Sequence, residues 1–429
     1  MKVRINNYLQ EQLKKLSIKF LNKYRPEIIA ITGSNGKSST KEAVFTVLKA
    51  KFNVLSSPGN YNTEFGVPLS ILEERMPYFT IKWPYILLKS YLKLSFKNHY
   101  YQKLVLEMAA DKPGDIEYLT SFIKPDVGIL TSIGESHLEL FKNVDNVAKE
   151  KSILLKRTKT DGFLCLNYDD PRILKIGKKL PHKIIWYGCS NKADLWGSNF
   201  EQNLNGIKFN INYKNDSLPI IIYNVLGKHF VYPLLAGAAV GIMYGMSLGK
   251  VINQLKKVNF PKGRMRIING INESKIIDDS YNANPNSMIA ALETLKLLKK
   301  DCLNKGRIIG VLGTMNELGD YEKQGHEKVG IKAAEILDFL VTIGKPANSY
   351  LTQAAIKKGF LPNRIFKFNN SIEAGQFLKK FIKNYDIILV KGSQNNVRTE
   401  WVVEQIMENP EKAKELLVRQ EHPWKKPKF

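Results

Sequence analysis

A short apolar run that leads into a glycine-rich turn is the part of this sequence best suited to chemistry. Residues 27–32 read as a strand, and they are followed by Gly33, Ser34, Asn35, Gly36, Lys37, Ser38 and Ser39. Glycines after a strand let backbone N–H groups converge on phosphate oxygens, the lysine can reach the terminal phosphates, and the Ser38 hydroxyl suits Mg²⁺. Because only two residues separate the glycines, an ordinary glycine turn is the alternative. The helix-compatible run at 40–43 favours a phosphate-binding loop.

Three further side chains could serve a bound nucleotide. Glu107 ends the apolar run 103–106, where a carboxylate can face nucleotide-bound Mg²⁺. His137 lies just past another strand end, and Lys151 follows it. Taken singly, a histidine after a strand is more often a structural hydrogen-bonding group, and Lys151 is one of many lysines. These residues gain weight only from their order in the chain.

Composition and charge restrict the class of protein. The chain has 429 residues, of which 44% are hydrophobic, so it can bury two or three cores. It has three scattered cysteines without a Cys-x-x-Cys pair, no signal-peptide core and no apolar run of membrane-spanning length, and we therefore expect a cytoplasmic location. The formal net charge of +25 is spread along the chain and accompanies no nucleic-acid-binding signature. We expect no nucleic-acid partner.

Apolar strand-like runs alternate with helical patterns along most of the chain. This alternation indicates an α/β fold in which helices cover parallel sheets. A break at 260–263 precedes a second series of strand and helix signals. We expect an N-terminal helical segment over 1–26, a central domain over 27–262 and a C-terminal domain over 263–429.

In this order, the motifs resemble those of the Mur ligase family, ATP-dependent enzymes that add amino acids or a dipeptide to the muramoyl peptide of cell-wall precursors. The resemblance extends over nearly the whole chain from residue 27 and includes residues 32–38, 58–68, 106–116, 124–127, the segment around His137, 278–288, 312–319 and 390–393. The Asn-Ala-Asn-Pro run at 282–285, with Met-x-Glu-Leu-Gly at 315–319 and Val-Lys-Gly-Ser at 390–393, is most similar to the member that adds D-alanyl-D-alanine. The implied folds are a P-loop NTPase-like parallel or mixed sheet in the central domain and a Rossmann-like α/β C-terminal domain.

The resemblance also implies a reaction. The γ-phosphoryl group of ATP passes to a carboxylate, the incoming amine attacks the resulting acyl phosphate, and phosphate leaves. The implied catalytic residues are Lys37, Glu107, His137 and Lys151. Ser38 and Glu107 would hold one Mg²⁺ ion, and Glu107, His137 and a carbamylated Lys151 would hold a second.

Further site residues follow from the same resemblance. ATP contacts are implied for Gly33, Ser34, Asn35, Gly36, Lys37, Ser38, Ser39, Arg264, Asp279, Tyr281 and Asn282. Contacts to the substrates, a muramoyl peptide and D-Ala-D-Ala, are implied for Asn60, Asn62, Thr63, Asn284 and Lys391.

Two features depart from the family pattern. Phe230 and Pro233 stand where members commonly carry asparagines, which affects the hydrogen bonds expected on the adenine side. Typical members also place a uridine-nucleotide-binding domain before the phosphate loop, where this sequence has about thirty residues. We expect a monomer that recognises its acceptor mainly through the muramoyl-peptide end.

In the segment 77–101, Lys89, Lys93 and Lys97 recur at four-residue spacing, which aligns the lysines on one helix face. They stand among leucines and aromatic residues that include Trp83, Tyr85, Tyr91, Phe96, Tyr100 and Tyr101. Such a helix can make a peripheral contact with an anionic membrane, and the alternative is a surface helix packed on its own domain.

Other functions stay open at this point. A folylpolyglutamate-type ligase usually has glycine after the loop lysine, where this chain has Ser38. A glutamine-dependent amidotransferase subunit of this fold would normally carry a four-cysteine zinc ribbon, which is absent from this sequence. A catalytically idle nucleotide-binding scaffold is opposed by the presence of Lys37, Glu107, His137 and Lys151.

Overall fold

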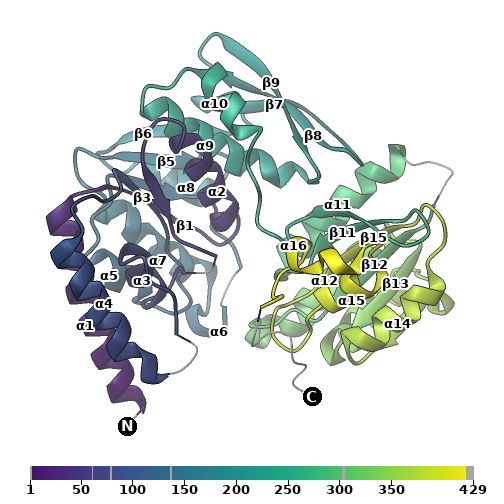
Figure 1. Cartoon of the computed structure of the whole chain (residues 1–429). Helices are drawn as coiled ribbons and strands as arrows, with labels where there is room; N and C mark the ends of the chain where they lie inside the picture. Colours follow the sequence, from purple (N-terminus) through teal and green to yellow (C-terminus); the bar gives the residue numbers. More distant parts are fainter. Residues whose placement is uncertain (1, 60, 78–79, 136–137, 302–305, 422–429) are drawn as a thin grey trace.

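The fold consists of two α/β bodies that lie side by side, as the computed structural model of the chain shows in Figure 1. The structure describes all residues except 1, 60, 78–79, 136–137, 302–305 and 422–429. Within the described residues, no helix is both long enough and apolar enough to cross a bilayer.

The central body is built on a nine-stranded sheet with strand order β2-β3-β1-β4-β5-β6-β7-β8-β9. Neighbouring strands from β2 to β7 pair in parallel, and β7, β8 and β9 form an antiparallel meander. The strands are β1 (Glu27–Thr32), β2 (Val54–Ser56), β3 (Lys103–Glu107), β4 (Val127–Leu130), β5 (Phe163–Asn167), β6 (Lys183–Gly188), β7 (Leu195–Asn203), β8 (Gly206–Tyr213) and β9 (Asp216–Tyr223).

Both faces of this sheet are covered by helices. Along β1, Ile29 and Ile31 pack into one core, and Ile28 and Ala30 pack into another, because successive side chains of a strand point to opposite faces. The first core includes α2 (Lys37–Leu48), α9 (Val231–Met243) and α10 (Leu248–Leu255). The second includes α1 (Lys2–Tyr24), α3 (Gly66–Ile71), α4 (Trp83–Phe96), α5 (Asp115–Thr120), α6 (Leu138–Phe141) and α7 (Val144–Arg157). The helix α8 (Pro171–Gly177) follows β5, and the short turns η1 (Thr80–Lys82) and η2 (Lys228–Phe230) precede α4 and α9.

The C-terminal body has a six-stranded sheet with order β10-β11-β15-β12-β13-β14, in which only β10 runs antiparallel to its neighbour. Its strands are β10 (Arg266–Asn269), β11 (Lys275–Asp279), β12 (Ile308–Gly313), β13 (Phe339–Ile343), β14 (Ile365–Phe368) and β15 (Ile387–Lys391). Its helices are α11 (Pro285–Asp301), α12 (Glu322–Ala334), α13 (Thr352–Lys357), α14 (Ser371–Phe381), α15 (Glu400–Ile406) and α16 (Ala413–Leu416), with the short turns η3 (Gly319–Tyr321), η4 (Ala347–Leu351), η5 (Pro362–Arg364) and η6 (Pro410–Lys412). The α/β fold class expected from the sequence is confirmed.

The register of each sheet gathers polar strand ends at one edge. Ile31 of β1 lies opposite Glu107 of β3, and Asp279 of β11 lies opposite Lys391 of β15. In parallel sheets, the carboxyl ends of neighbouring strands form the crevice where ligands bind. Each body therefore presents such an edge.

A close approach fixes the turn after β1. Gly33 has a φ of 150°, and a Cβ atom built on it would lie 2.0 Å from Oγ1 of Thr131, just past β4. The backbone N–H of Ser34 donates to the Ser132 carbonyl at 2.8 Å. Only glycine fits this position, because a side chain there would collide with the segment after β4.

Helix α1 is an integral part of the central body. Phe20 is fully buried, and its ring lies 6.0 Å from that of Tyr100, which in turn stacks on Tyr24 at 4.9 Å. Helix α1 (Lys2–Tyr24) packs into the same core as α3 and α4.

The lysines of α4 point toward their own domain. Lys89 and Lys93 reach the carboxylate of Glu74 at 3.0 and 2.5 Å, and Lys97 pairs with Glu73. The three lysines therefore pair with acidic residues that follow α3 in their own domain, and the peripheral membrane contact expected through 77–101 stays a prediction.

We expect Phe20→Ala to lower the free energy of unfolding of the central body by about 3–5 kcal/mol, because it leaves a cavity between α1 and α4. Urea unfolding followed by circular dichroism measures this change in the first transition. Tyr8→Ala, at an exposed position of the same helix, should change it by less than about 0.5 kcal/mol. A loss below about 1 kcal/mol for Phe20→Ala would mean that α1 does not contribute to this core.

We expect Gly33→Ala to destabilise the central body by about 2 kcal/mol or more, from backbone strain and the collision with Thr131. The matched control is Gly249→Ala in α10, where a Cβ atom meets nothing within 4 Å, and where alanine should be neutral or stabilising by up to about 1 kcal/mol. Thermal unfolding of the two variants compares them directly. Equal melting temperatures would contradict the close approach.

Candidate active site

Two adjoining cavities lie where the central and C-terminal bodies meet. The apolar cavity, of about 270 Å³, is lined among others by His229, Phe230, Tyr232, Pro233 and Ala290. The polar cavity, of about 320 Å³, is lined among others by Lys37, Asn62, Glu107, Asp111, Asn282 and Asn316. The residues shared by the two cavities are Asn35, Gly36, Ser38, Arg264 and Ser287. The turn after β1 thus separates an aromatic compartment from a charged one.

The shape of this turn is held by the segment after β4. The backbone N–H of Asn35 donates to Ser132 Oγ at 2.9 Å, and Thr131 Oγ1 donates to the Asn35 carbonyl at 2.6 Å. Ser34 Oγ exchanges hydrogen bonds with the backbone of Gly134. Sequence reasoning gave Thr131 and Ser132 no role, although they belong to a motif that it noted. The feature that could have predicted their role is their position directly after a strand that is parallel to β1 and next to it.

Lys37 begins α2 at the floor of the polar cavity. Its Nζ donates to the Gly33 carbonyl at 2.8 Å, so the side chain folds back over the turn. The surrounding protein lowers the pKa of Lys37, the nearby Glu107 carboxylate opposes this shift, and Arg264 adds to it. An anion entering the cavity would meet this lysine and the N-terminus of α2 together, which is the arrangement that binds phosphate.

Glu107 offers an oxygen for a cation. Its side chain is 2% exposed, and its Oε1 accepts a hydrogen bond from Asn62 at 3.0 Å. Its Oε2 is buried without a hydrogen-bond partner among the described residues. A buried carboxylate oxygen without a donor is costly unless a ligand compensates it, and carboxylate and hydroxyl oxygens suit Mg²⁺. Ser38 lines both cavities and can supply that hydroxyl.

Not all of the remaining predicted metal ligands lie among the described residues. His137 lies outside the described residues, as does the predicted substrate contact Asn60. Over the part of the chain that the structure describes, no group of three or more His, Cys, Asp and Glu side chains could hold a metal ion. Among the described residues, a metal at Glu107 could draw on the Ser38 hydroxyl as a further donor.

Lys151 is 1% exposed in α7 and does not itself line either cavity. Burial lowers the pKa of Lys151 to about 7, and the charge of Lys37 adds to this effect, while Asp111 and Glu150 oppose it. A substantial fraction of this amine is then neutral near pH 7. A neutral amine can react with CO₂, which an ammonium group cannot do.

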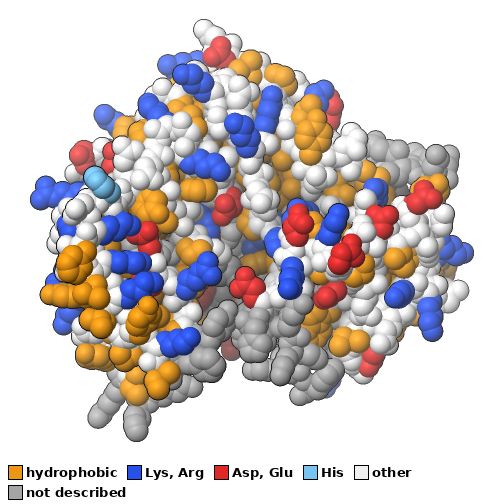
Figure 2. All heavy atoms as spheres, in the orientation of Figure 1, with side chains coloured by type: hydrophobic (Ala, Val, Ile, Leu, Met, Phe, Trp, Pro, Cys, Tyr) orange, Lys and Arg blue, Asp and Glu red, His pale blue; other side chains and the backbone are white. Residues whose placement is uncertain are grey.

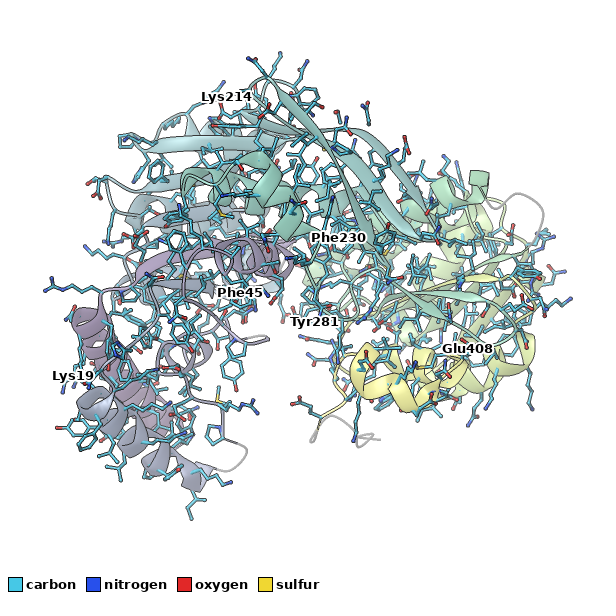
Figure 3. The ribbon with its side chains drawn as sticks, turned by 45° about the horizontal axis from the view of Figure 1, so that its top comes forward. Lys19, Phe45, Lys214, Phe230, Tyr281 and Glu408 are labelled. Carbon is cyan, nitrogen blue, oxygen red and sulfur yellow. The ribbon has the colours of Figure 1, made fainter. Side chains whose placement is uncertain are left out.

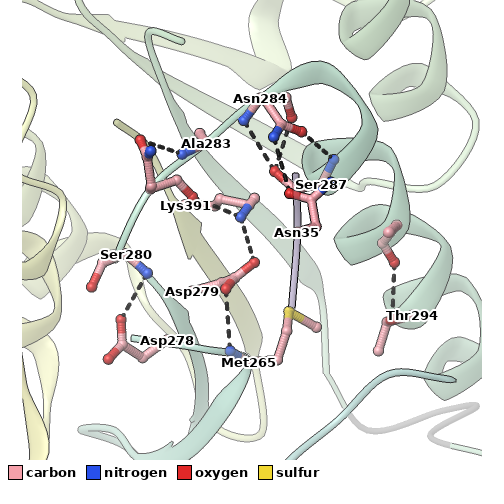
Figure 4. A network of polar contacts seen from close by, with 12 residues as sticks. Asn35, Met265, Asp278, Asp279, Ser280, Ala283, Asn284, Ser287, Thr294 and Lys391 are labelled. Atoms are coloured by element: carbon pink, nitrogen blue, oxygen red, sulfur yellow. Dashed lines mark hydrogen bonds and ion pairs between the residues drawn. The ribbon is translucent and has the colours of Figure 1, made fainter. Parts of the chain in front are cut away.

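The C-terminal body contributes a network at the ends of β11 and β15 (Figure 4). Lys391 Nζ lies 2.6 Å from Asp279 Oδ2 and donates to the Asn282 carbonyl at 2.9 Å. The guanidinium group of Arg264 lies 4.0 Å from the ring centroid of Tyr281. Lys391, which was predicted to bind substrate, lines the apolar cavity and is 1% exposed.

Hydrogen bonds join the two bodies directly, among them one from Gln202 Nε2 of β7 to the Thr294 carbonyl of α11 at 2.9 Å. Asn284 Nδ2, at the start of α11, donates to Asn35 Oδ1 in the turn after β1 at 3.2 Å (Figure 4). Phe230 and Tyr281 both lie close to the junction between the bodies (Figure 3). The residues predicted to bind ATP in the two domains, far apart in the sequence, are therefore close in space.

Several contributors were missed by the sequence reasoning. Lys41 is 1% exposed, and its Nζ donates to the carbonyls of Ser57 and Gly59 at 2.6 and 3.1 Å, which positions the segment that leads to Asn62 and Thr63. Asn316 and Gln394 line the polar cavity. Lys41 is one helical turn after Lys37, but nothing in the sequence distinguishes it from a surface lysine.

The apolar cavity is lined by Phe230 and Pro233 at the two positions where family members commonly carry asparagines. Phe230 is 1% exposed, and its ring packs against Phe260 at 4.5 Å, so it closes the cavity from behind. His229 lines the cavity, and its ring lies 4.6 Å from that of Phe230. A neutral imidazole can donate one hydrogen bond and accept another, so His229 can bond to polar atoms at the edge of a planar ring.

Comparison with known proteins agrees with this arrangement. Residues 31–241 match a family described as the Mur ligase middle domain, and residues 263–394 match the Mur ligase, glutamate ligase domain. The UDP-N-acetylmuramoyl-tripeptide–D-alanyl-D-alanine ligase of Buchnera aphidicola subsp. Baizongia pistaciae is 31% identical, with 90% of this chain and 76% of that protein covered. The enzyme of the same name from Bacillus subtilis is 29% identical, with 93% and 79% covered.

A solved structure, the MurF ligase from Thermotoga maritima in complex with ADP, is also similar. It has a TM-score of 0.76 and 25% identity, and the match covers 94% of this chain and 84% of that one. The two matching domains meet at the cavities described above, and the resemblance of the sequence motifs is confirmed. The chain belongs to the Mur ligase family.

Proposed function

We propose that this chain is an ATP-dependent ligase that joins D-alanyl-D-alanine to a muramoyl-peptide cell-wall precursor through an acyl phosphate. The observation that carries this proposal is the position of the glycine-rich turn between an aromatic and a charged cavity, with Lys37 and the unpartnered Glu107 oxygen on the charged side. Relatives named for this reaction match most of the chain.

The two cavities suggest how a nucleoside triphosphate binds. The base and ribose would occupy the apolar cavity beside His229 and Phe230, and the N–H groups of the turn would hold the phosphates. The terminal phosphate would then lie in the polar cavity next to Lys37. The ADP complex of the similar Thermotoga ligase supports adenine as the base.

The chemistry follows from what a carboxylate requires. A carboxylate oxygen of the acceptor attacks the γ-phosphorus, ADP leaves, and the acyl phosphate forms. The amine of the incoming dipeptide then attacks the acyl carbon and loses one proton to solvent or to the departing phosphate, and the tetrahedral intermediate expels phosphate to leave an amide. Lys37 and Arg264 would offset negative charge on the transferring group, and closure by the C-terminal body would exclude water from the acyl phosphate.

The residues present fit Mg²⁺, because Glu107 has a buried oxygen without a donor and Ser38 adds a hydroxyl. Ser38 and Glu107 would hold a first ion, and Glu107, His137 and a carbamylated Lys151 a second. Mg²⁺ in these positions would withdraw charge from the phosphate oxygens during transfer.

Carbamylation of Lys151 would remove a positive charge that is unfavourable at its position. An ammonium group at this buried position would repel both Lys37 and a cation. Attack of the neutral Nζ lone pair on CO₂, with loss of one proton, gives a carbamate whose oxygens are anionic ligands. The low pKa of Lys151, about 7, supports this modification.

The acceptor and the assembly state belong to the same proposal. Asn62 and Thr63 line the polar cavity, where the muramoyl peptide would end, and Asn284 lines it from the C-terminal body. We propose a cytoplasmic monomer. Phosphate release from ATP, measured with a panel of muramoyl peptides and with D-Ala-D-Ala, D-Ala or L-amino acids, tests the substrate pair. Release with folate and glutamate instead would favour the folylpolyglutamate-type alternative.

Lys37→Ala should reduce acceptor-dependent phosphate release by about 10²-fold or more, because it removes a preorganised positive charge from the phosphoryl group. Lys49→Ala, at an exposed position beyond the end of α2, is the matched control and should retain full activity. Circular dichroism should show both variants folded. Near wild-type ligation by Lys37→Ala would rule out the role of the loop.

Lys151→Ala should inactivate the enzyme, and millimolar acetate or formate should partly restore activity by supplying a carboxylate at the vacated ligand position. The control is Lys149→Ala, an exposed lysine on the same helix, which should behave as wild type. Wild-type activity should also fall in CO₂-depleted buffer and recover with bicarbonate. If Lys151→Ala remains fully active under CO₂ depletion, the carbamate is not used.

A further inference from the structure

Exposed apolar side chains gather on one surface of the molecule. Among the described residues, eighteen large hydrophobic side chains are exposed, and eight of them belong to α1, η1 or α4. Figure 2 shows hydrophobic side chains concentrated at the lower left, where Figure 1 places α1 and α4. Such a concentration on one surface is a mark of an interaction site.

Five exposed residues of η1 and α4 form a single stripe. Ile81, Tyr85, Leu88, Leu92 and Phe96 are spaced by three or four residues, and their side chains are 85%, 65%, 59%, 45% and 77% exposed. This spacing puts them on one face of the helix. We call this stripe, together with the exposed side of α1, the outer face.

The outer face is distinct from the surface that holds α4 in the fold. Trp83, Ile86 and Ser90 are buried on the opposite side of the helix. A helix that only covers its own domain is normally polar on its far side, whereas α4 is apolar on both. The outer stripe is therefore not explained by the packing of the central body.

Positive charge borders the stripe. Lys15, Lys19 and Lys23 of α1 are exposed at four-residue spacing, and Lys19 Nζ lies 5.9 Å from the ring centroid of Tyr91 in α4. Figure 3 shows Lys19 at the outer edge of the molecule. The lysines of α1 thus stand beside the apolar stripe, while those of α4 are held by Glu73 and Glu74.

The charge balance selects the kind of partner. Residues 2–26 contain seven Lys or Arg and one acidic residue, whereas three of the four lysines within residues 77–101 are already paired with Glu73 and Glu74. A second copy of the chain would bring like charges together, which is unfavourable. An anionic lipid surface complements them, since lysines bind headgroup phosphates while aromatic and aliphatic side chains enter the headgroup and acyl boundary.

We propose that the outer face of α1 and α4 binds the surface of an anionic lipid bilayer, with α4 lying along the plane of the interface. Leu88, Leu92 and Phe96 would insert, Tyr85 and Tyr91 would lie at the headgroup level, and the α1 lysines would contact phosphates. The contact is peripheral and reversible.

This surface is connected to the polar cavity. The Phe65 and Trp83 rings lie 5.8 Å apart, the backbone N–H of Met76 donates to the Tyr61 hydroxyl at 2.7 Å, and Gln10 donates to Glu64 at 3.2 Å. The segment that carries Asn62 and Thr63 therefore rests on the base of the outer face. As a consequence that rests on the proposed function, bilayer binding would favour an acceptor carried by a lipid.

The test is co-sedimentation of the full chain with vesicles of phosphatidylcholine alone or with phosphatidylglycerol. We expect binding to the anionic vesicles that weakens with salt, and little binding to phosphatidylcholine. Leu88→Glu/Leu92→Glu should reduce binding by about tenfold or more. Its matched control, Ile356→Glu/Leu361→Glu, changes two exposed apolar residues of the C-terminal body and should have no effect.

A second pair separates charge from insertion. Lys15→Ser/Lys19→Ser should weaken binding to anionic vesicles and reduce its salt dependence, whereas Lys250→Ser/Lys256→Ser, at exposed positions in and after α10, should change both less. Phosphate release with a soluble acceptor should be the same in all these variants. A failure of bilayer binding is thus distinguishable from a failure of the proposed function.

Three results would overturn the inference. The first is wild-type protein that does not sediment with anionic vesicles at low salt. The second is unchanged binding by Leu88→Glu/Leu92→Glu. The third is a wild-type dimer that this double variant converts to a monomer without any effect of lipid, which would assign the outer face to a protein interface.

Discussion

The close contact between the turn after β1 and the segment after β4 is the constraint on which the site depends. Gly33 leaves room for Thr131, and the hydrogen bonds from Thr131 and to Ser132 fix the backbone of Asn35. With that backbone fixed, Lys37 starts α2 at the floor of the polar cavity, and Asn35 can accept the hydrogen bond from Asn284 of the other body. The turn after β1 thus also serves as one of the contacts between the two bodies.

Several positively charged side chains are buried around the site. Lys37, Lys151, Lys391 and Arg264 are gathered at the site, and burial works against the charge of the three lysines. Lys391 is paired with Asp279, while Lys37 has its hydrogen bond to a carbonyl and the nearby carboxylates of Glu107 and Asp111. A bound phosphate would add negative charge next to Lys37 and Arg264. Preorganised charge of this kind stabilises phosphoryl transfer without reorganisation at the moment of reaction.

The outer face of α1 and α4 and the active site share structural elements. The same core that buries Phe20 and Trp83 supports the segment of Asn62 and Thr63. Because Lys93 in α4 and Lys97 at its end pair with Glu74 and Glu73, the apolar stripe of α4 faces away from the domain. Packing inside the domain therefore decides which face of α4 can meet a partner.

The sequence alone determined the phosphate-binding turn, the α/β class and the family, because these depend on local periodicity and on residue types at fixed short spacings. It also named Glu107, Arg264 and Asp279, which the structure brings to the two cavities. Only the tertiary structure decided which way Lys89, Lys93 and Lys97 point, that Thr131 and Lys41 shape the site, and that Lys391 pairs with Asp279 in the apolar cavity. Those facts depend on which strand lies beside which and which helix packs on which face, and contacts between residues distant in the chain leave no periodic trace in the sequence.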